Sequence, residues 1–98
     1  MRRYLTLSAD YMQPSLRDHA VGQMVIDLAG LSDDLVARLI AWNSEYQVIV
    51  PLDLRQRRSL ARSIERLDAR GIALADEIER ALAPANVTYY SEGWLRNL

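Results

Sequence analysis

The clearest pattern in the chain is a stripe of apolar or small residues with helical spacing in its second half. These residues recur at alternating steps of three and four, which places them on one face of a helix: Leu60, Ile64, Leu67, Gly71, Leu74, Ile78 and Leu82. Asp53 can cap the start by accepting hydrogen bonds from free backbone N–H groups, and Pro84 cannot continue a helix. The pattern therefore predicts one long helix between Asp53 and Pro84.

The pattern leaves the shape of this helix open in two respects. About thirty residues at 1.5 Å each would span about 45 Å, whereas a globule of this size is about 30–35 Å across. The helix must therefore overhang, bend or start late. Gly71 lies on the apolar stripe, where it costs about 1 kcal/mol of helix propensity relative to alanine. Either close packing against a strand or second helix offsets that cost, or the helix kinks there.

Two further patterns predict strands near the ends of the chain. Polar and apolar residues alternate strictly from Arg3 to Ser8, which is typical of a half-buried strand. Branched and aromatic residues from Asn86 to Ser91 predict a second strand. Between the strands lies a predicted first helix, which Ser32 can cap and which ends near Tyr46; its apolar face contains Leu35, Leu39, Trp42 and Tyr46.

The remaining segments are harder to assign. Residues 10–30 hold no single period, which predicts either a long functional loop or a loop with one helical turn and a short strand. Gln47 to Leu52 is a β-branched run interrupted by Pro51, so it fits an edge strand or, as we favour, an apolar connector. Two strands alone are marginally stable, so we expect a third from residues 24–28 or 47–50.

Together these elements predict an α+β fold in a single domain of residues 1–98. We expect a small β-sheet that includes the N- and C-terminal strands and packs against two main helices. The terminal strands should pair with each other. A helical crossover permits parallel pairing, but the sequence does not fix the direction.

The composition limits the kinds of metal site, disulfide and catalytic group that the chain can form. The chain has no cysteine and one histidine, which excludes a disulfide framework and most zinc sites, and we expect neither a metal nor a cofactor. Asp18 beside His19 is the one candidate acid–base pair, and a solvated loop histidine is the better interpretation, so we expect no enzyme. No apolar run of signal-peptide or membrane-spanning length develops, which predicts a cytoplasmic protein with no membrane partner.

The charges are distributed unevenly, although they nearly cancel at a formal net charge of −1. All twelve cations are arginine, and four of them repeat at four-residue spacing along the predicted long helix: Arg58, Arg62, Arg66 and Arg70. Arg55 and Arg57 extend this basic end. The ridge is either a ligand surface for phosphates or an acidic partner or, as we favour, a solvated face with Glu65 and Asp68 interleaved.

Acidic residues gather in sequence around the irregular segment and the first helix start: Asp10, Asp18, Asp27, Asp33 and Asp34. Such a surface could occupy the basic cleft of a nuclease. Asp33 and Asp34 also have a structural explanation, because they offset the helix dipole. Tyr11 and Trp94 are aromatic residues in polar stretches, where exposed aromatic side chains favour an interface, although Trp94 could instead fold back onto the sheet.

Four stretches carry a likeness to a group of small bacterial proteins. They are the opening Tyr4–Tyr11, then Leu31-Ser32 ahead of Leu35, Leu39 and Trp42-Asn43, then Gly71 with Leu74-Ala75 and Ile78, and finally Val87–Tyr90. In these stretches, which span most of the chain, the sequence resembles immunity proteins of contact-dependent growth inhibition systems, in particular the Burkholderia-like ones.

The resemblance implies a protein that binds a C-terminal toxin domain, commonly a nuclease acting on tRNA or DNA, and neutralises it without chemistry of its own. We predict the toxin-binding residues to be Asp10, Tyr11, Asp18, Asp27, Asp33, Asp34, Glu92 and Trp94. Replacing Asp10, Asp18 and Asp27 together should then weaken toxin binding without unfolding the domain. The alternatives are a nucleic-acid-binding or regulatory domain that uses the arginine ridge, and a small housekeeping domain that shares the fold.

Overall fold

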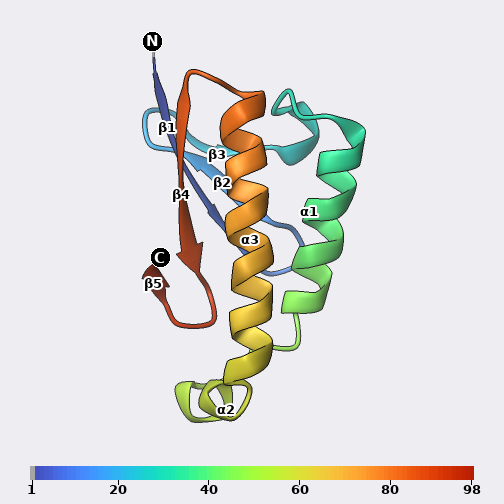
Figure 1. Ribbon diagram of the computed structural model, residues 1–98, viewed down its shortest axis with the longest axis vertical. Coiled ribbons are helices and arrows are strands. Elements are labelled where there is room, and N and C mark those ends of the chain that lie inside the picture. Colours follow the sequence, from blue (N-terminus) through green and yellow to red (C-terminus); the bar gives the residue numbers. More distant parts are fainter. Residues whose placement is uncertain (1) are drawn as a thin grey trace.

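The computed structural model describes residues 2–98 and shows one sheet with helices packed on one of its faces (Figure 1). The strands are β1 (Arg3–Ser8), β2 (Ser15–Asp18), β3 (Gly22–Met24), β4 (Ala85–Ser91) and β5 (Arg96–Asn97). The helices are a 3₁₀ turn η1 (Ile26–Leu28), α1 (Asp33–Tyr46), α2 (Leu54–Ser59) and α3 (Ala61–Ala81). The predicted α+β class is therefore confirmed.

The two predicted terminal strands lie side by side at the centre of the sheet. The strand order is β3-β2-β1-β4-β5, and β1 pairs with β4 in parallel, with Leu5 opposite Val87 and Leu7 opposite Tyr89. All other neighbouring strands pair antiparallel. Because parallel strands need a crossover, the helices connect the end of one central strand to the start of the other.

Alternation along the strands decides which face of the sheet is covered. Leu5 and Leu7 of β1 are fully buried beneath the helices, and Leu16 of β2 and Tyr89 of β4 lie buried beside them. The other face carries Tyr4, which is 56% exposed. In Figure 1 both long helices, α1 and α3, lie on the same side of the sheet, as the sequence predicts.

The first helix and the connector after it follow the sequence closely. The Ser32 hydroxyl accepts a hydrogen bond from the Leu35 N–H at 3.2 Å, which caps α1, and the helix ends at Tyr46. The chain then forms turns instead of an edge strand, with Ile49 and Val50 buried. The favoured interpretation of this segment as an apolar connector is confirmed.

The prediction of one long helix from Asp53 to Pro84 is wrong in one respect. Asp53 does begin a helix, through a capping box with Gln56, but α2 ends after six residues and Leu60 adopts a non-helical φ of −111°. Residues 54–59 carry no apolar stripe, so packing against the sheet does not select a continuous axis there. The helix thus starts late, at Ala61, and α2 folds across its end (Figure 1).

Gly71 lies where α3 packs closely against β4 of the sheet. A Cβ atom there would lie 2.6 Å from Cζ and 2.7 Å from the hydroxyl oxygen of Tyr89 on β4. The helix continues without interruption from Ala61 to Ala81. Close packing against a strand, and not a kink, therefore explains this glycine.

The predicted position of the third strand, in residues 24–28 or 47–50, is wrong, whereas the alternative of a helical turn and a short strand within residues 10–30 is close to the structure. Residues 47–50 form turns, and only Met24 of residues 24–28 belongs to a strand. The strand next to β1 is instead β2, which with β3 forms a hairpin inside the segment that holds no single period. Pairing with β1 stabilises β2 although Leu16 is its single apolar residue, so this strand depends on tertiary contacts.

Candidate functional site

A buried hydrogen-bond network joins both long helices to the sheet. The Asp68 carboxylate of α3 accepts hydrogen bonds from the hydroxyls of Tyr46 at 2.8 Å, Tyr89 at 2.6 Å and Ser91 at 2.6 Å. Burial raises the pKa of Tyr46 and of Tyr89, and the Asp68 carboxylate raises both further. The Tyr46 hydroxyl oxygen accepts a bond from the Gly93 N–H at 2.8 Å, so the network also fixes the turn after β4.

Arg57 holds the same turn from the other side. Its guanidinium donates to the backbone carbonyls of Leu52 at 2.8 Å, Val50 at 2.9 Å and Gly93 at 3.3 Å, and to that of Glu92. The side chain is buried, so it is not part of the exposed basic end that its neighbours in sequence suggested. Arg57 therefore joins the connector after α1 to the C-terminal turn.

Two acidic residues from distant parts of the sequence follow neighbouring strands at one end of the sheet. Asp10 follows β1 and Glu92 follows β4, and the parallel pairing brings these two strand ends together. Partial burial raises the pKa of Glu92; Arg57, 3.7 Å from its carboxylate, lowers it, and the negative charge of Asp10 raises it. The ionised Glu92 carboxylate therefore destabilises the folded state.

Glu92→Gln is expected to raise the free energy of unfolding at neutral pH. A carboxyl whose pKa is higher in the folded state destabilises the fold once it is ionised, and glutamine resembles the protonated form. The gain should shrink as the pH falls to about 4, because the wild-type carboxyl then becomes protonated. Urea unfolding at the two pH values measures this, and a loss of stability at neutral pH would contradict it.

The loop between β1 and β2 places the candidate residues Asp10 and Tyr11 at the surface. Tyr11 is 64% exposed and Met12 90% exposed. Side chains of α1 hold the loop: the Asn43 side-chain oxygen accepts from the Asp10 N–H at 2.9 Å, and the Gln47 amide donates to the Asp10 carbonyl at 2.7 Å. The loop is therefore exposed at its apex and fixed to the helix at its start.

Asp27 lies beside this loop. It lines a hollow of about 170 Å³ together with Met12 and Gln13 of the loop, Ile26, and Ile40 of α1. The structure thus gathers four of the eight candidate toxin-binding residues around one end of the sheet: Asp10, Tyr11, Asp27 and Glu92. We call these four residues together with Met12 the loop surface.

The remaining acidic candidates lie elsewhere. Asp33 and Asp34 begin α1, ten and nine residues before Asn43, so the helical rise separates them from the Asn43 contact with the loop by about 14–15 Å. Asp34 also accepts a hydrogen bond from Arg38 at 2.9 Å. These two residues are therefore distant from the Asp10 part of the loop surface.

Asp18 and Trp94 are tied into the fold. The Asp18 carboxylate is buried, accepts the Ala20 N–H at 2.8 Å and pairs with Arg3 at 3.3 Å; these contacts, the backbone bond first, lower its pKa. Trp94 is half-buried against the core, and its backbone N–H donates to the Ser91 hydroxyl at 3.0 Å. Because Asp18 supports the fold, replacing it together with Asp10 and Asp27 would mix a loss of stability with any loss of toxin binding.

His19 forms no acid–base pair with Asp18. Its Nε2 atom lies 2.7 Å from the Thr6 hydroxyl on the exposed face of the sheet, while the Asp18 carboxylate binds Arg3 and Ala20. In residues 2–98 no three His, Asp or Glu side chains gather as a metal site. Within the same range, no helix combines the length and apolar character that a membrane span requires.

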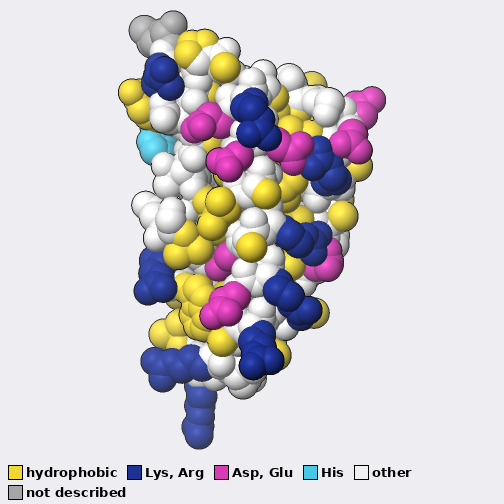
Figure 2. Space-filling model, in the orientation of Figure 1, with side chains coloured by type: hydrophobic (Ala, Val, Ile, Leu, Met, Phe, Trp, Pro, Cys, Tyr) yellow, Lys and Arg dark blue, Asp and Glu magenta, His cyan; other side chains and the backbone are white. Residues whose placement is uncertain are grey.

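The arginine ridge is divided by the helix break. Arg62, Arg66 and Arg70 lie on α3, but Arg58 lies on α2. Arg70 pairs with Glu45 of α1 at 2.6 Å, so it also joins the two helices. Figure 2 shows basic side chains along one side and the lower end of the helical face, and acidic side chains mainly above them.

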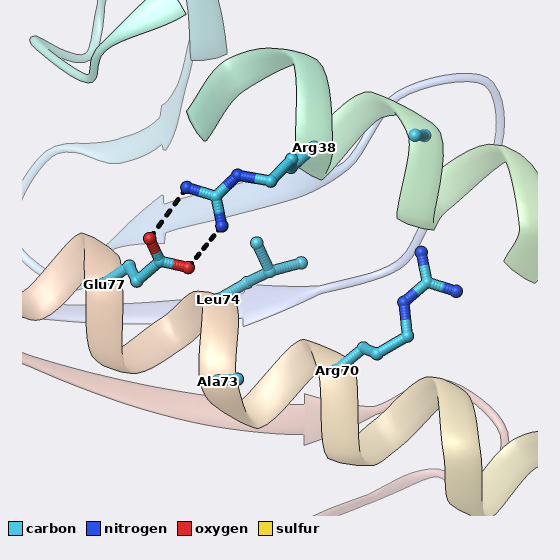
Figure 3. Close-up of a pocket in the computed structure, with 6 residues that line it drawn as sticks. Arg38, Arg70, Ala73, Leu74 and Glu77 are labelled. Atoms are coloured by element: carbon cyan, nitrogen blue, oxygen red, sulfur yellow. Dashed lines mark hydrogen bonds and ion pairs between the residues drawn. The ribbon is translucent and has the colours of Figure 1, made fainter. Parts of the chain in front are cut away.

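A second ion pair, between Arg38 and Glu77, also joins α1 and α3. Arg38 donates two parallel hydrogen bonds to the Glu77 carboxylate, at 2.5 and 2.7 Å (Figure 3). This contact raises the pKa of Arg38 and lowers that of Glu77. The pair borders a hollow of about 220 Å³ lined by Ala41, Ala73 and Leu74, so Arg38 helps to join the helices.

Fold and site together define a small α+β protein with an exposed loop clamped by a helix. A family comparison matches residues 3–92, and the chain belongs to the Serratia CdiI immunity protein-like family. No curated protein and no solved structure matches the chain significantly. The resemblance to immunity proteins of contact-dependent growth inhibition is therefore confirmed, and membership of this family supports neutralisation of a cognate toxin.

Sequence reasoning missed three residues of the site. Met12 is 90% exposed in the loop, while Asn43 and Gln47 position the loop from α1. Met12 could have been noticed, because it is an apolar residue next to Tyr11 in a polar stretch. Gln47 gave no such signal, because its role depends on how α1 lies against the β1–β2 loop.

Proposed function

We propose that the protein is a stoichiometric inhibitor of a toxin domain of a contact-dependent growth inhibition system, and that this domain is a nuclease. Family membership over residues 3–92 carries the proposal. The protein acts in the cytoplasm of the protected cell by binding, with no reaction of its own. Within the wider class of these immunity proteins, we expect the Burkholderia-like ones to be near relatives.

The loop surface supports a basic partner. Asp10 and Asp27 are exposed carboxylates beside two exposed apolar residues, Tyr11 and Met12. A nuclease must bind phosphates, so its cleft is expected to be basic. Acidic side chains would attract such a cleft over distance, and the apolar residues would supply buried contact area on arrival.

Co-expression with the toxin domain encoded directly upstream tests the proposed function. Expression of that domain alone should arrest bacterial growth and degrade tRNA or DNA, which gel electrophoresis of total nucleic acid detects. Co-expression of the protein should restore growth and leave the nucleic acid intact. Continued arrest with both proteins present would contradict the proposal, and rescue from a toxin that leaves nucleic acid intact would contradict the nuclease assignment.

Asp10→Asn with Asp27→Asn is expected to weaken toxin binding about tenfold, mainly through a slower association rate. Asparagine keeps the side-chain shape and removes the charge that steers a basic partner. Because salt screens charge, the difference from wild type should shrink at high ionic strength. Stopped-flow association kinetics with the toxin domain at low and high salt measures both effects.

A matched control removes the same charge elsewhere. Glu65→Gln with Asp76→Asn changes two exposed acidic residues of α3. The control pair should leave the association rate within about twofold of wild type. Equal slowing by both pairs would mean that net charge, and not the loop surface, steers the partner.

The arginine ridge remains a prediction for the alternative function. Arg70 already pairs with Glu45, which leaves Arg62 and Arg66 as the ridge members on α3 to test. If the purified protein retains RNA or DNA, binding should fall steeply with salt and be weakened by Arg62→Gln with Arg66→Gln. Such a result without toxin binding would favour a nucleic-acid-binding domain.

A further inference from the structure

The β1–β2 loop contains a tight turn with a left-handed residue at its apex. The Gln13 N–H donates to the Tyr11 carbonyl at 2.7 Å, which closes a three-residue turn around Met12. Met12 has a φ of 66°, a value that glycine adopts readily and that methionine rarely adopts. A γ-turn of this hand is rare and strained, and such strain persists only where the surroundings fix the backbone.

Gln47 of α1 supplies much of that constraint. Its amide nitrogen donates to the Asp10 carbonyl at 2.7 Å, and its amide oxygen accepts a long hydrogen bond from the Met12 N–H at 3.5 Å. One side chain thus contacts the backbone on both sides of Tyr11. Ala9 before the loop and Pro14 after it are buried, so the loop is also held at its two ends.

Asn43 holds the start of the loop, although its burial destabilises the fold. Its side-chain oxygen accepts the Asp10 N–H at 2.9 Å, while its side-chain nitrogen is buried with no hydrogen-bond partner within residues 2–98. A buried donor without a partner destabilises a fold. An apolar residue at this position would avoid that cost, but it could not hold Asp10.

The loop therefore combines three features that suit a contact surface. Its backbone is fixed before any partner arrives, which lowers the entropy lost on binding. Its apex exposes Tyr11 and Met12, and tyrosine and methionine are enriched in the cores of protein interfaces. The carboxylates of Asp10 and Asp27 lie beside them, which fits a basic partner.

We propose that residues 10–13 form a preorganised anchor that inserts Tyr11 and Met12 into an apolar pocket on the basic face of the toxin domain. This inference rests on the proposed function and names the surface that performs it. Tyr11 and Met12 contact the toxin, and Gln47 is a positioning residue that acts through the loop backbone.

Removal of the two anchor side chains tests the contact directly. Tyr11→Ser with Met12→Asn should raise the dissociation constant for the upstream-encoded toxin domain at least about tenfold, mainly through faster dissociation. Asparagine tolerates a positive φ, so the turn is kept while the apolar side chain is lost. Binding of the variant in solution to immobilised toxin domain gives the association and dissociation rates. Urea unfolding confirms that the variant is folded.

The control pair removes similar side chains at other exposed positions. Tyr4→Ser lies on the uncovered face of β1, and Val21→Asn lies in the turn between β2 and β3. Tyr4 is 56% exposed and Val21 79% exposed, close to the values for the anchor pair. This pair should leave the dissociation constant within about twofold of wild type.

A double-mutant cycle separates positioning by Gln47 from a general effect on the fold. Gln47→Ala alone should weaken toxin binding about tenfold, because the loop must then be ordered on binding. In the background without Tyr11 and Met12 side chains, the same change should weaken binding by less than about twofold. An equal effect of Gln47→Ala in both backgrounds would overturn its positioning role.

The outcomes distinguish this inference from the proposed function. If wild type and the anchor variant bind the toxin domain equally tightly, the anchor is overturned while the inhibitor function stands. If wild type itself does not bind that domain, both are overturned. Weak binding by the anchor variant, with normal binding by the control pair, supports the anchor.

Discussion

Asp68→Ala is expected to lower the free energy of unfolding by about 3–5 kcal/mol, a large part of the ordinary 5–15 kcal/mol of a small domain. The change leaves the buried hydroxyls of Tyr46, Tyr89 and Ser91 without their common acceptor. It also opens a gap between α3 and β4. The variant is therefore expected to unfold at a clearly lower urea concentration than wild type.

Urea unfolding measures this effect, with Asp76→Ala as the control. Asp76 lies on the same helix but is exposed, so its replacement should change the free energy of unfolding by less than about 0.5 kcal/mol. Tyr89→Phe removes one of the three hydrogen bonds and should fall between the two. If Asp68→Ala were as stable as Asp76→Ala, the network would not be what joins these elements.

Gly71→Ala is expected to destabilise the fold by about 2–3 kcal/mol, although alanine is the better helix former. Helix propensity alone predicts a gain of about 1 kcal/mol. The added Cβ, however, would lie 2.6 Å from Cζ of Tyr89. That ring cannot move freely, because it donates to Asp68 and packs 6.0 Å from the Trp42 ring. Steric overlap should therefore outweigh propensity.

The Tyr89→Leu background tests this explanation of Gly71. Leucine lacks the outer ring atoms that the added Cβ would meet. In that background Gly71→Ala should be neutral or stabilising, so that the sign of its effect changes. Thermal or urea unfolding of the four proteins gives the interaction free energy. A loss of the same size in both backgrounds would show that contact with Tyr89 is not the cause.

The helical elements could be predicted from the sequence because their signals are local. The apolar stripe of α3 and the Ser32 cap of α1 both act within a few turns of the residues that carry them. The break at Leu60 could not be predicted in this way. Next to the break, Arg57 donates hydrogen bonds to the carbonyl groups of Glu92 and Gly93, which are contacts across about 35 residues that no local pattern reveals.

The positions of the small strands could not be predicted for a related reason. Residues 15–18 offer one apolar position, Leu16, and no β-branched residue. They become a strand because β1 presents an edge with which they pair, from Leu5 opposite Asp18 to Ser8 opposite Ser15. Short strands of this kind are specified by a neighbour more than by their own composition.

The candidate site was predicted in part. Asp10 and Tyr11 attracted notice as an acid and an aromatic residue in a polar stretch, and the structure exposes both at one loop. Sequence proximity misleads for the other acids, because Asp33 and Asp34 lie at the far end of α1 and Asp18 is buried. The part played by Gln47 depends on a helix–loop contact across 37 residues, which periodicity does not reveal.

Titration of the purified toxin domain with this protein tests the central claim most directly. The account predicts that toxin activity on nucleic acid falls linearly and is abolished at one molar equivalent, and that the two chains then elute as one complex. Complete inactivation by a small fraction of an equivalent would instead indicate catalysis. Undiminished toxin activity at a molar excess of the protein would contradict the account altogether.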